Sequence, residues 1–312
     1  MSSYRPDYTK APRYTGIRTF MKLGLDLKMD GSDVAVIGLP FDTGASFRAG
    51  ARFGPAAIRE MSVLLRPAHS FHKINPFEHV RCVDYGDLPL LPGYMEDSFD
   101  IIRDTYRRLA REKVIPVGLG GDHSVTLAEL RGLADVYGPL SLVHFDAHGD
   151  TWDEYWGKKY THGTPFRRAL EEEIIDPHHS VQIGLRGTVY HPDDMDEAAE
   201  LGFEVIAADE LHTLHPTDLR RRIENRVGDR NAFLTFDIDF FDPAYAPGTG
   251  TPEVGGFTSH QGLTFVRHLP LLNYVGFDLV EVLPAHDHSQ NTALLGAAVV
   301  YEFLALIALN ES

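Results

Sequence analysis

Short apolar runs, separated by polar or glycine-rich turns, recur along almost the whole chain. Each run is continuously apolar rather than alternating, which is typical of strands buried on both faces of a parallel sheet. The pattern predicts strands at residues 33–40, 79–87, 114–121, 140–146, 180–187, 203–209, 231–239 and 275–282.

Amphipathic segments with helical spacing lie between many of these runs. They predict helices at residues 96–112, 124–137, 193–201, 217–227 and 259–270. This alternation indicates an α/β fold built from βαβ units around a mainly parallel sheet of about eight strands, with a closed barrel as the rival architecture.

The last apolar segment, residues 292–309, has the length of a helix and contains Glu302. Its small residues and this charge favour a buried closing helix over a membrane span. No internal repeat or linker divides the chain. We therefore expect a single domain over residues 1–312, in which residues 1–32 form an N-terminal extension that packs on the domain or on a neighbouring subunit.

The composition narrows the classes of partner. The chain has 312 residues, 43% of them hydrophobic, and a net charge of −16 without any concentration of lysine and arginine. Nucleic acid is therefore not an expected partner. The single cysteine, Cys82, excludes an internal disulfide and favours a reducing compartment. Because the N-terminus has no apolar run, we expect a cytoplasmic protein that does not bind membranes.

Acidic and imidazole side chains follow four of the predicted strands. The carboxyl ends of strands form the active crevice in both open α/β sheets and barrels, so these side chains are expected to converge. They occur in the stretches "GGDHS", "HFDAHGD", "TFDIDFFDP" and "LVEVLP", as Asp122, His123, Asp146, His148, Asp150, Asp237, Asp239, Asp242 and Glu281.

The spacing within two of these stretches predicts a metal site. Alternate positions of an extended backbone point to the same side, so Asp146 and His148 share a side, as do Asp237 and Asp239. Carboxylates at this density require cations. Oxygen ligands with one imidazole per ion suit Mn²⁺, with Fe²⁺, Ni²⁺ or Co²⁺ as alternatives. Two such ions about 3.5–4 Å apart would activate water for hydrolysis. A single Asp-x-Asp is more often a turn former, and Ser124 could simply cap a helix.

The three metal-ligand stretches together resemble the ureohydrolase family, which includes arginase, agmatinase and related guanidino-acid hydrolases. The resemblance covers about residues 34 to 308 and is closest to agmatinase-type members, as in "GLPFDTGASFRAGARFGPAAIRE". It implies a three-layer α/β/α fold, a binuclear manganese centre with two Mn²⁺ per subunit, and hydrolysis of a guanidinium group to urea and an amine. It also implies a homo-oligomer, either a trimer or a hexamer.

The resemblance assigns roles by position. One metal would be held by His123, Asp146, Asp150 and Asp237, and the other by Asp146, His148, Asp237 and Asp239. Glu281 would hold the guanidinium, His162 in "THGTP" would shuttle protons, and Asp150 would also take part in catalysis. The chemistry agrees, because a planar guanidinium with paired N–H donors matches a carboxylate, and a departing amine needs a proton from a group such as imidazole.

Four positions differ from the family pattern and bear on the substrate: Gly149, Thr235, Leu283 and His286. None of them removes a predicted metal ligand. They alter the expected polarity of the pocket, so the family pattern alone does not identify the guanidino compound.

The segment "TWDEYWGKKYTHGTP" predicts the binding site for the substrate tail. Trp152, Tyr155 and Trp156 could line the entrance and stack on a cation or an alkyl chain. We expect agmatine, cleaved to putrescine and urea, as the substrate. Guanidino acids such as 4-guanidinobutanoate or 3-guanidinopropanoate are the alternative if nearby basic residues bind a carboxylate, namely Lys158, Lys159, Arg167 and Arg168.

Three further alternatives stay open at this level. Free or methylated guanidine could be the substrate, in which case the metal could be Ni²⁺. A catalytically silent subunit and a metal-dependent deacetylase are the rivals from other classes. The complete set of predicted ligands favours an active ureohydrolase over both.

Overall fold

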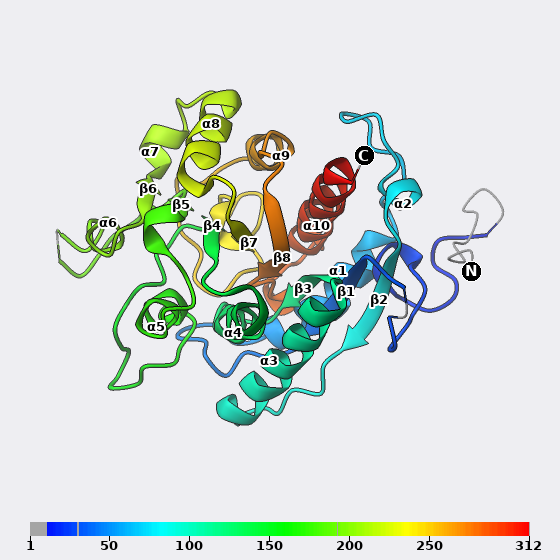
Figure 1. The fold of residues 1–312 in the computed structure, drawn as a ribbon, viewed down its shortest axis with the longest axis horizontal. Helices are drawn as coiled ribbons and strands as arrows, with labels where there is room; N and C mark the ends of the chain where they lie inside the picture. Colours follow the sequence, from blue (N-terminus) through cyan, green and yellow to red (C-terminus); the bar gives the residue numbers. More distant parts are fainter. Residues whose placement is uncertain (1–10, 30, 192, 312) are drawn as a thin grey trace.

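The chain folds as three layers, with helices on both faces of one central sheet (Figure 1). The computed structural model describes residues 11–29, 31–191 and 193–311. The sheet has eight strands in the order β2-β1-β3-β8-β7-β4-β5-β6. All neighbouring strands are parallel. The strands are Val34–Leu39 (β1), Cys82–Asp87 (β2), Ile115–Gly120 (β3), Ser141–Phe145 (β4), Val181–Ile183 (β5), Glu204–Ile206 (β6), Asn231–Asp237 (β7) and Asn273–Val280 (β8).

This sheet is open, because β2 and β6 lie at its two ends and do not pair with each other in the described part of the chain. The predicted α/β fold with a mainly parallel sheet of about eight strands is therefore confirmed, and the closed barrel is excluded. The continuous burial of strands such as β1, β4 and β7 explains their uninterrupted apolar sequences.

Two apolar clusters fix the helices to the sheet. On one face, α1, α8, α9 and α10 contribute residues such as Ile58, Leu219 and Phe265. On the other face, α3, α4 and α5 contribute residues such as Leu130 and Phe166. The helices are Gly54–Ser62 (α1), Pro76–His79 (α2), Met95–Glu112 (α3), Val125–Tyr137 (α4), Pro165–Glu171 (α5), Glu197–Glu200 (α6), Ala208–Leu211 (α7), Pro216–Val227 (α8), Ser259–Arg267 (α9) and Asn291–Asn310 (α10).

Helix α10 is the predicted closing helix. Among the described residues, α10 is the one helix that is long and apolar enough to cross a membrane. However, 83% of its most apolar 18-residue stretch is buried inside the protein. It packs against α1, α2, α9 and β8. Its apolar sequence is therefore explained by burial in the protein core.

The sequence pattern misplaced several short elements. Helix α6 covers only Glu197–Glu200 of the helix predicted at 193–201, and the predicted strand at 203–209 ends in the short helix α7. Strand β5 ends at Ile183 because Gly184 adopts a φ of 104°, which side-chain-bearing residues avoid. Helices α1 and α5 were not predicted, since both carry proline in the first turn, where it resembles a loop.

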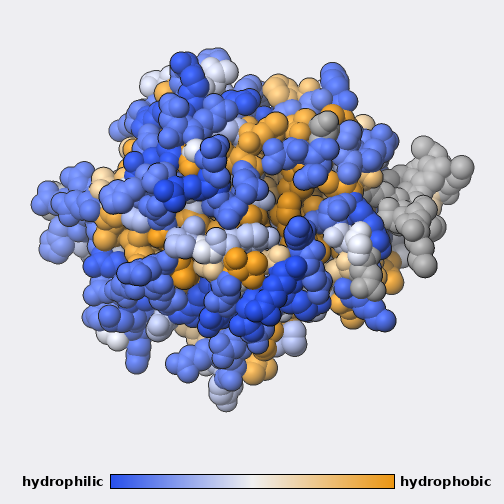
Figure 2. All heavy atoms as spheres, in the orientation of Figure 1, coloured by the Kyte–Doolittle hydropathy of each residue, from blue (hydrophilic) through white to orange (hydrophobic). Residues whose placement is uncertain are grey.

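The described part of the N-terminal extension lies against the β2 edge of the sheet. Phe20 is fully buried, and its backbone N–H donates to Asp84 Oδ2 at 2.6 Å. Leu25 forms a parallel bridge with Asp84. Residues 1–10 of the predicted extension lie outside the described residues. The surface in Figure 2 is mainly hydrophilic with smaller apolar areas between, in keeping with the net charge of −16.

Candidate metal centre

The order of the strands brings the acidic stretches together. Strands β3, β8, β7 and β4 are consecutive neighbours in the sheet. The four stretches leave the carboxyl ends of these strands, so residues more than one hundred positions apart in sequence meet at one edge. The site therefore lies where open parallel sheets commonly bind ligands.

The first group of side chains surrounds His123. Its Nδ1 lies 3.1 Å from Asp146 Oδ2, 2.9 Å from Asp150 Oδ2 and 3.4 Å from Asp237 Oδ2. Its Nε2 lies 2.9 Å from the hydroxyl oxygen of Thr235. With Nε2 donating to Thr235, the lone pair of Nδ1 faces the three carboxylates, which is the arrangement a metal-binding imidazole needs.

The second group of side chains surrounds His148. Its Nδ1 lies 3.4 Å from Asp146 Oδ1 and 3.1 Å from Asp239 Oδ2. The two oxygens of Asp146 therefore face different imidazoles. The structure thus brings together all six residues predicted as metal ligands: His123, Asp146, His148, Asp150, Asp237 and Asp239.

The electrostatics of these groups fit a pair of divalent ions. Burial, and then the charges of Asp239 and Asp146, raise the pKa of Asp237 well above its ordinary value. Burial and the charge of Asp146 raise the pKa of Asp239 to about 6. His123 Nδ1 and Asp239 Oδ2 are buried without hydrogen-bond partners. Buried carboxylates that repel one another in this way are stabilised by bound cations.

His144 supports the centre and was not among the predicted site residues. Its Nε2 lies 2.8 Å from Asp146 Oδ2, and Gln182 Nε2 lies 3.1 Å from its Nδ1. Burial alone would raise the pKa of Asp146, but the neighbouring imidazoles of His123 and His144 hold it well below its ordinary value. The period-two spacing of "HFDAH" was the available signal, since it places His144 on the same side as Asp146 and His148.

Glu281 lies beside this centre with one oxygen free to bind a substrate. Its Oε1 accepts the His123 backbone N–H at 3.0 Å and lies 2.8 Å from His162 Nδ1. Its Oε2 is buried and has no partner. A Cβ at Gly250 would lie 2.8 Å from Oε2, so the glycine keeps this space open. Glu281 also has a φ of 62°, a strained backbone that is common at functional sites.

His162 is arranged to exchange a proton. The Ser46 backbone N–H donates to its Nε2 at 3.0 Å, and the Ser46 hydroxyl lies 2.6 Å from the same nitrogen. A neutral ring accepts from the Ser46 N–H at Nε2, and a protonated ring can donate to the Ser46 hydroxyl once the contact with the backbone N–H lengthens. Burial alone would lower the pKa of His162, but the charge of Glu281 raises it to about 9.

A small cavity of about 80 Å³ opens onto these groups. Trp152 and Tyr155 line it, as predicted residues of the substrate entrance, together with Ser46 and Thr251. A larger cavity of about 300 Å³ adjoins it and shares both aromatic residues. Trp156 is 75% exposed and does not line either cavity. The structure therefore places two of the three predicted aromatic residues at the entrance.

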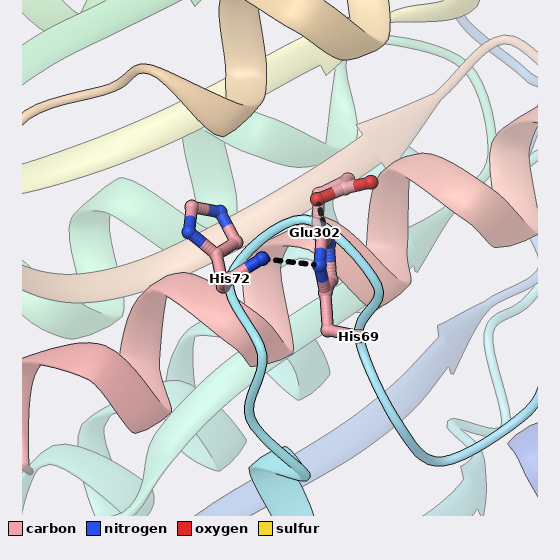
Figure 3. Close-up of side chains that lie close together, drawn as sticks. All are labelled: His69, His72 and Glu302. Carbon is pink, nitrogen blue, oxygen red and sulfur yellow. Dashed lines mark hydrogen bonds and ion pairs between the residues drawn. The ribbon is translucent and has the colours of Figure 1, made fainter.

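A second group of potential ligands lies far from this centre, between α10 and the loop before α2 (Figure 3). The N–H groups of Phe71 and His72 both donate to His69 Nδ1 at 3.2 Å. The ring proton is therefore on Nε2, which donates to Glu302 at 2.7 Å. The other oxygen of Glu302 accepts from Arg267 at 2.8 Å. Because His69 would have to lose its proton to bind a metal, this cluster is a structural tether.

The open α/β sheet and the buried cluster of carboxylates and imidazoles define a metal-dependent hydrolase. Residues 32–306 match the model of the arginase family. The chain is 46% identical to guanidinopropionase from Pseudomonas aeruginosa, covering 97% of this chain and 95% of that protein. It is 42% identical to mitochondrial agmatinase from Gallus gallus, covering 95% of this chain and 87% of that protein.

The structure of proclavaminate amidinohydrolase from Streptomyces clavuligerus superposes with a TM-score of 0.92 at 42% identity, covering 96% of this chain and 100% of that one. The chain belongs to the arginase family. It is an amidinohydrolase that acts on guanidino compounds, which confirms the resemblance to the ureohydrolases. Arginase-family enzymes use a binuclear metal centre, for which the two groups of side chains above are the candidate ligands.

Proposed function

We propose that this enzyme hydrolyses a short guanidino acid, such as 3-guanidinopropanoate or 4-guanidinobutanoate, to urea and an amino acid. The observation that carries the proposal is the distribution of charge around the entrance. Two acidic residues beside the entrance, Asp153 and Glu197, are already paired with arginines, whereas one arginine between the lining loops has no acidic partner. This choice departs from agmatine, the first expectation from the sequence.

Two of the acidic groups near the aromatic loop are occupied by arginines. Asp153 is paired with Arg168 at 2.6 Å, and Glu197 is paired with Arg167 at 3.1 Å. A terminal ammonium, as in agmatine, would have to compete with an arginine for either of these two carboxylates. The same pairing occupies Arg167 and Arg168, two of the four basic residues considered as partners of a substrate carboxylate, the others being Lys158 and Lys159.

Arg48 is the better candidate to bind the substrate carboxylate. Ser46 and Thr251 both line the small cavity, and Arg48 lies between the two loops that carry them. Arg48 comes two residues after Ser46. Its Nη1 donates at 3.2 Å to the carbonyl of Thr249, two residues before Thr251. Arg48 makes no ion pair with any carboxylate of the described residues. The similarity to guanidinopropionase supports the same substrate class.

The proposed mechanism assigns a task to each residue of the site. Bound to the two groups of ligands, two Mn²⁺ ions would supply the Lewis acidity that activates water near neutral pH. Glu281 Oε2 accepts N–H groups of the guanidinium and fixes its plane. His162 transfers a proton to the departing amine, and Ser46 exchanges hydrogen-bond roles with it. Water and the guanidino group thus yield urea and a primary amine.

A substrate panel tests the proposal. Urea release would be measured with 3-guanidinopropanoate, 4-guanidinobutanoate, agmatine, arginine and guanidine, each after loading with Mn²⁺ or Ni²⁺. We expect the highest kcat/KM with one of the two guanidino acids and Mn²⁺. Faster turnover of agmatine or of free guanidine would overturn the proposed substrate, and higher activity with Ni²⁺ would overturn the proposed metal.

The variant Arg48→Ala tests the proposed carboxylate contact. A hydrogen bond to a charged group contributes about 1.5–3 kcal/mol, so kcat/KM for the preferred acid should fall about ten- to a hundred-fold. Activity on guanidine, which has no carboxylate, should stay unchanged. Arg103→Ala is the matched control, because Arg103 is paired with Asp135 on the surface and its loss changes the net charge equally. An equal loss on the acid and on guanidine would contradict this role.

A further inference from the structure

A group of fully buried polar side chains lies behind the candidate metal centre. Tyr106 comes from α3, Glu129 and Thr126 from α4, Asp278 from β8 and Thr235 from β7, and all are 0% exposed. Thr126 donates to Asp278 Oδ2 at 2.6 Å. No basic residue is paired with either carboxyl group in the described parts of the chain. Two carboxyl groups buried without a cation call for a physical explanation.

These side chains converge on the backbone of Gly118 in β3. A Cβ at Gly118 would lie 2.9 Å from the Tyr106 hydroxyl oxygen, 3.0 Å from Glu129 Oε2 and 3.1 Å from Asp278 Cβ. The Tyr106 hydroxyl, both Glu129 oxygens and Asp278 Oδ1 have no assigned hydrogen-bond partners. A proton on Glu129 would supply the missing donor, because two buried carboxyl groups in proximity share a proton rather than both ionise.

The same group is connected to His123. In the register of β7 and β8, Thr235 is the direct neighbour of Asp278, so their side chains lie next to each other on one face of the sheet. Thr235 Oγ1 also lies 2.9 Å from His123 Nε2. The Thr235 hydroxyl therefore lies between Asp278 and Nε2 of the His123 ring, the nitrogen on the side away from the metal centre.

We propose that Asp278, supported by Glu129 and Tyr106, is a positioning residue that holds the His123 ring with its Nδ1 lone pair facing the metal centre. The inference builds on the proposed metal-dependent function and concerns one half of the binuclear site. Within the described residues the His148 ring makes no hydrogen bond of this kind, and its side chain is 33% exposed. Disturbing the network should therefore weaken the ion bound by His123 and spare the ion bound by His148.

The test is a titration of the metal-free protein with Mn²⁺, by calorimetry and by electron paramagnetic resonance. In Asp278→Asn we expect the affinity for one of two ions to fall about ten- to a hundred-fold, as is typical when a partner of a metal-binding histidine is removed. The affinity for the other ion should stay unchanged, and the spectrum at one equivalent should be that of an isolated ion. Unchanged affinity for both ions, or an equal loss for both, would overturn the proposal.

Two further variants separate positioning from general stability. Thr235→Val removes the connecting hydroxyl and should reproduce the effect, whereas Thr235→Ser retains the hydroxyl and should restore normal affinity. Glu302→Gln disturbs the buried tether of Figure 3, so it should lower the free energy of unfolding without changing either affinity. If Glu302→Gln weakened Mn²⁺ binding as much as Asp278→Asn, the effect would be structural only.

The wild-type titration distinguishes this proposal from the proposed function. Fewer than two bound Mn²⁺ ions per chain in the wild type would refute the binuclear function itself. Two bound ions, together with unchanged affinities in Asp278→Asn and Thr235→Val, would refute only the positioning network.

Discussion

At the scale of single residues, the pair formed by His162 and Glu281 is the most sensitive part of the site. Glu281 Oε2 is free to bind the substrate, and Glu281 Oε1 lies 2.8 Å from His162 Nδ1. One charge thus orients the guanidinium and maintains the basicity of the proton donor. Removing this charge while preserving the shape of the side chain should affect both tasks.

Glu281→Gln makes that expectation measurable. Against the effect of burial, the Glu281 charge raises the pKa of His162 to about 9, so in the variant this pKa should fall towards the ordinary value. An NMR titration of the metal-free variant would show the change, and kcat/KM should fall about a hundred- to a thousand-fold, as for other lost transition-state contacts. Glu302→Gln serves as the control with an unchanged His162 pKa. A His162 pKa that stays near 9 in Glu281→Gln would contradict this account.

The sequence identified residues whose spacing has a direct structural meaning. Asp146 with His148, and Asp237 with Asp239, follow the period of an extended backbone, so a shared side was predictable. Ser46 was not predictable, because its contact with His162 spans 116 positions. Asp278 was not predictable either, because the role of a carboxyl group within an apolar strand depends on its neighbours on β7 and α4, which are distant in sequence.

At the scale of elements, the loop after β7 shapes the substrate site through Gly250. This glycine is needed for space rather than for its conformation, because its φ is not in the left-handed region, while an added Cβ would lie 2.8 Å from Glu281 Oε2. The loop and the end of β8 therefore have to approach each other closely. Longer side chains at position 250 would displace the carboxylate.

Gly250→Ala should therefore reduce activity without unfolding the protein. We expect kcat/KM to fall about a hundred-fold, as for a displacement of about 1 Å at a catalytic group, with a small change in Tm. Gly24→Ala is the matched control, since a Cβ at Gly24 would have no heavy atom within 4 Å. Wild-type activity in Gly250→Ala would show that Glu281 has more freedom than the structure indicates.

At the scale of the whole molecule, the strand order creates the site. The sequence predicted eight strands and their type, because buried parallel strands have a recognisable composition. It did not predict the order β3-β8-β7-β4 at the centre of the sheet, which depends on how the helices pack over both faces. The convergence of four stretches could be expected from their positions at strand ends, but which residues touch could not.

Because the pKa values of several candidate metal ligands are shifted, the stability of the folded chain and its binding of metal ions should both depend on pH. Burial and like charges raise the folded-state pKa values of Asp237 and Asp239, the latter to about 6. Between about pH 5 and 7 the folded metal-free chain therefore binds more protons than the unfolded chain. The contribution of these two carboxyl groups to the free energy of unfolding is lost as the pH rises. Asp146, whose pKa is lowered, is ionised throughout this range and adds no slope.

Bound Mn²⁺ should reverse this dependence, because the ions bind the ionised carboxylates and stabilise only the folded chain. At a free concentration of one hundred times Kd, each ion contributes about 2.7 kcal/mol. We therefore expect the increase in Tm on adding Mn²⁺ to be larger at pH 8 than at pH 5.5, as measured by calorimetry on the same preparation. In Asp237→Asn the gain should be smaller at pH 8 and depend less on pH. An equal increase in the wild type at both pH values would mean that protons and Mn²⁺ do not compete for these carboxylates.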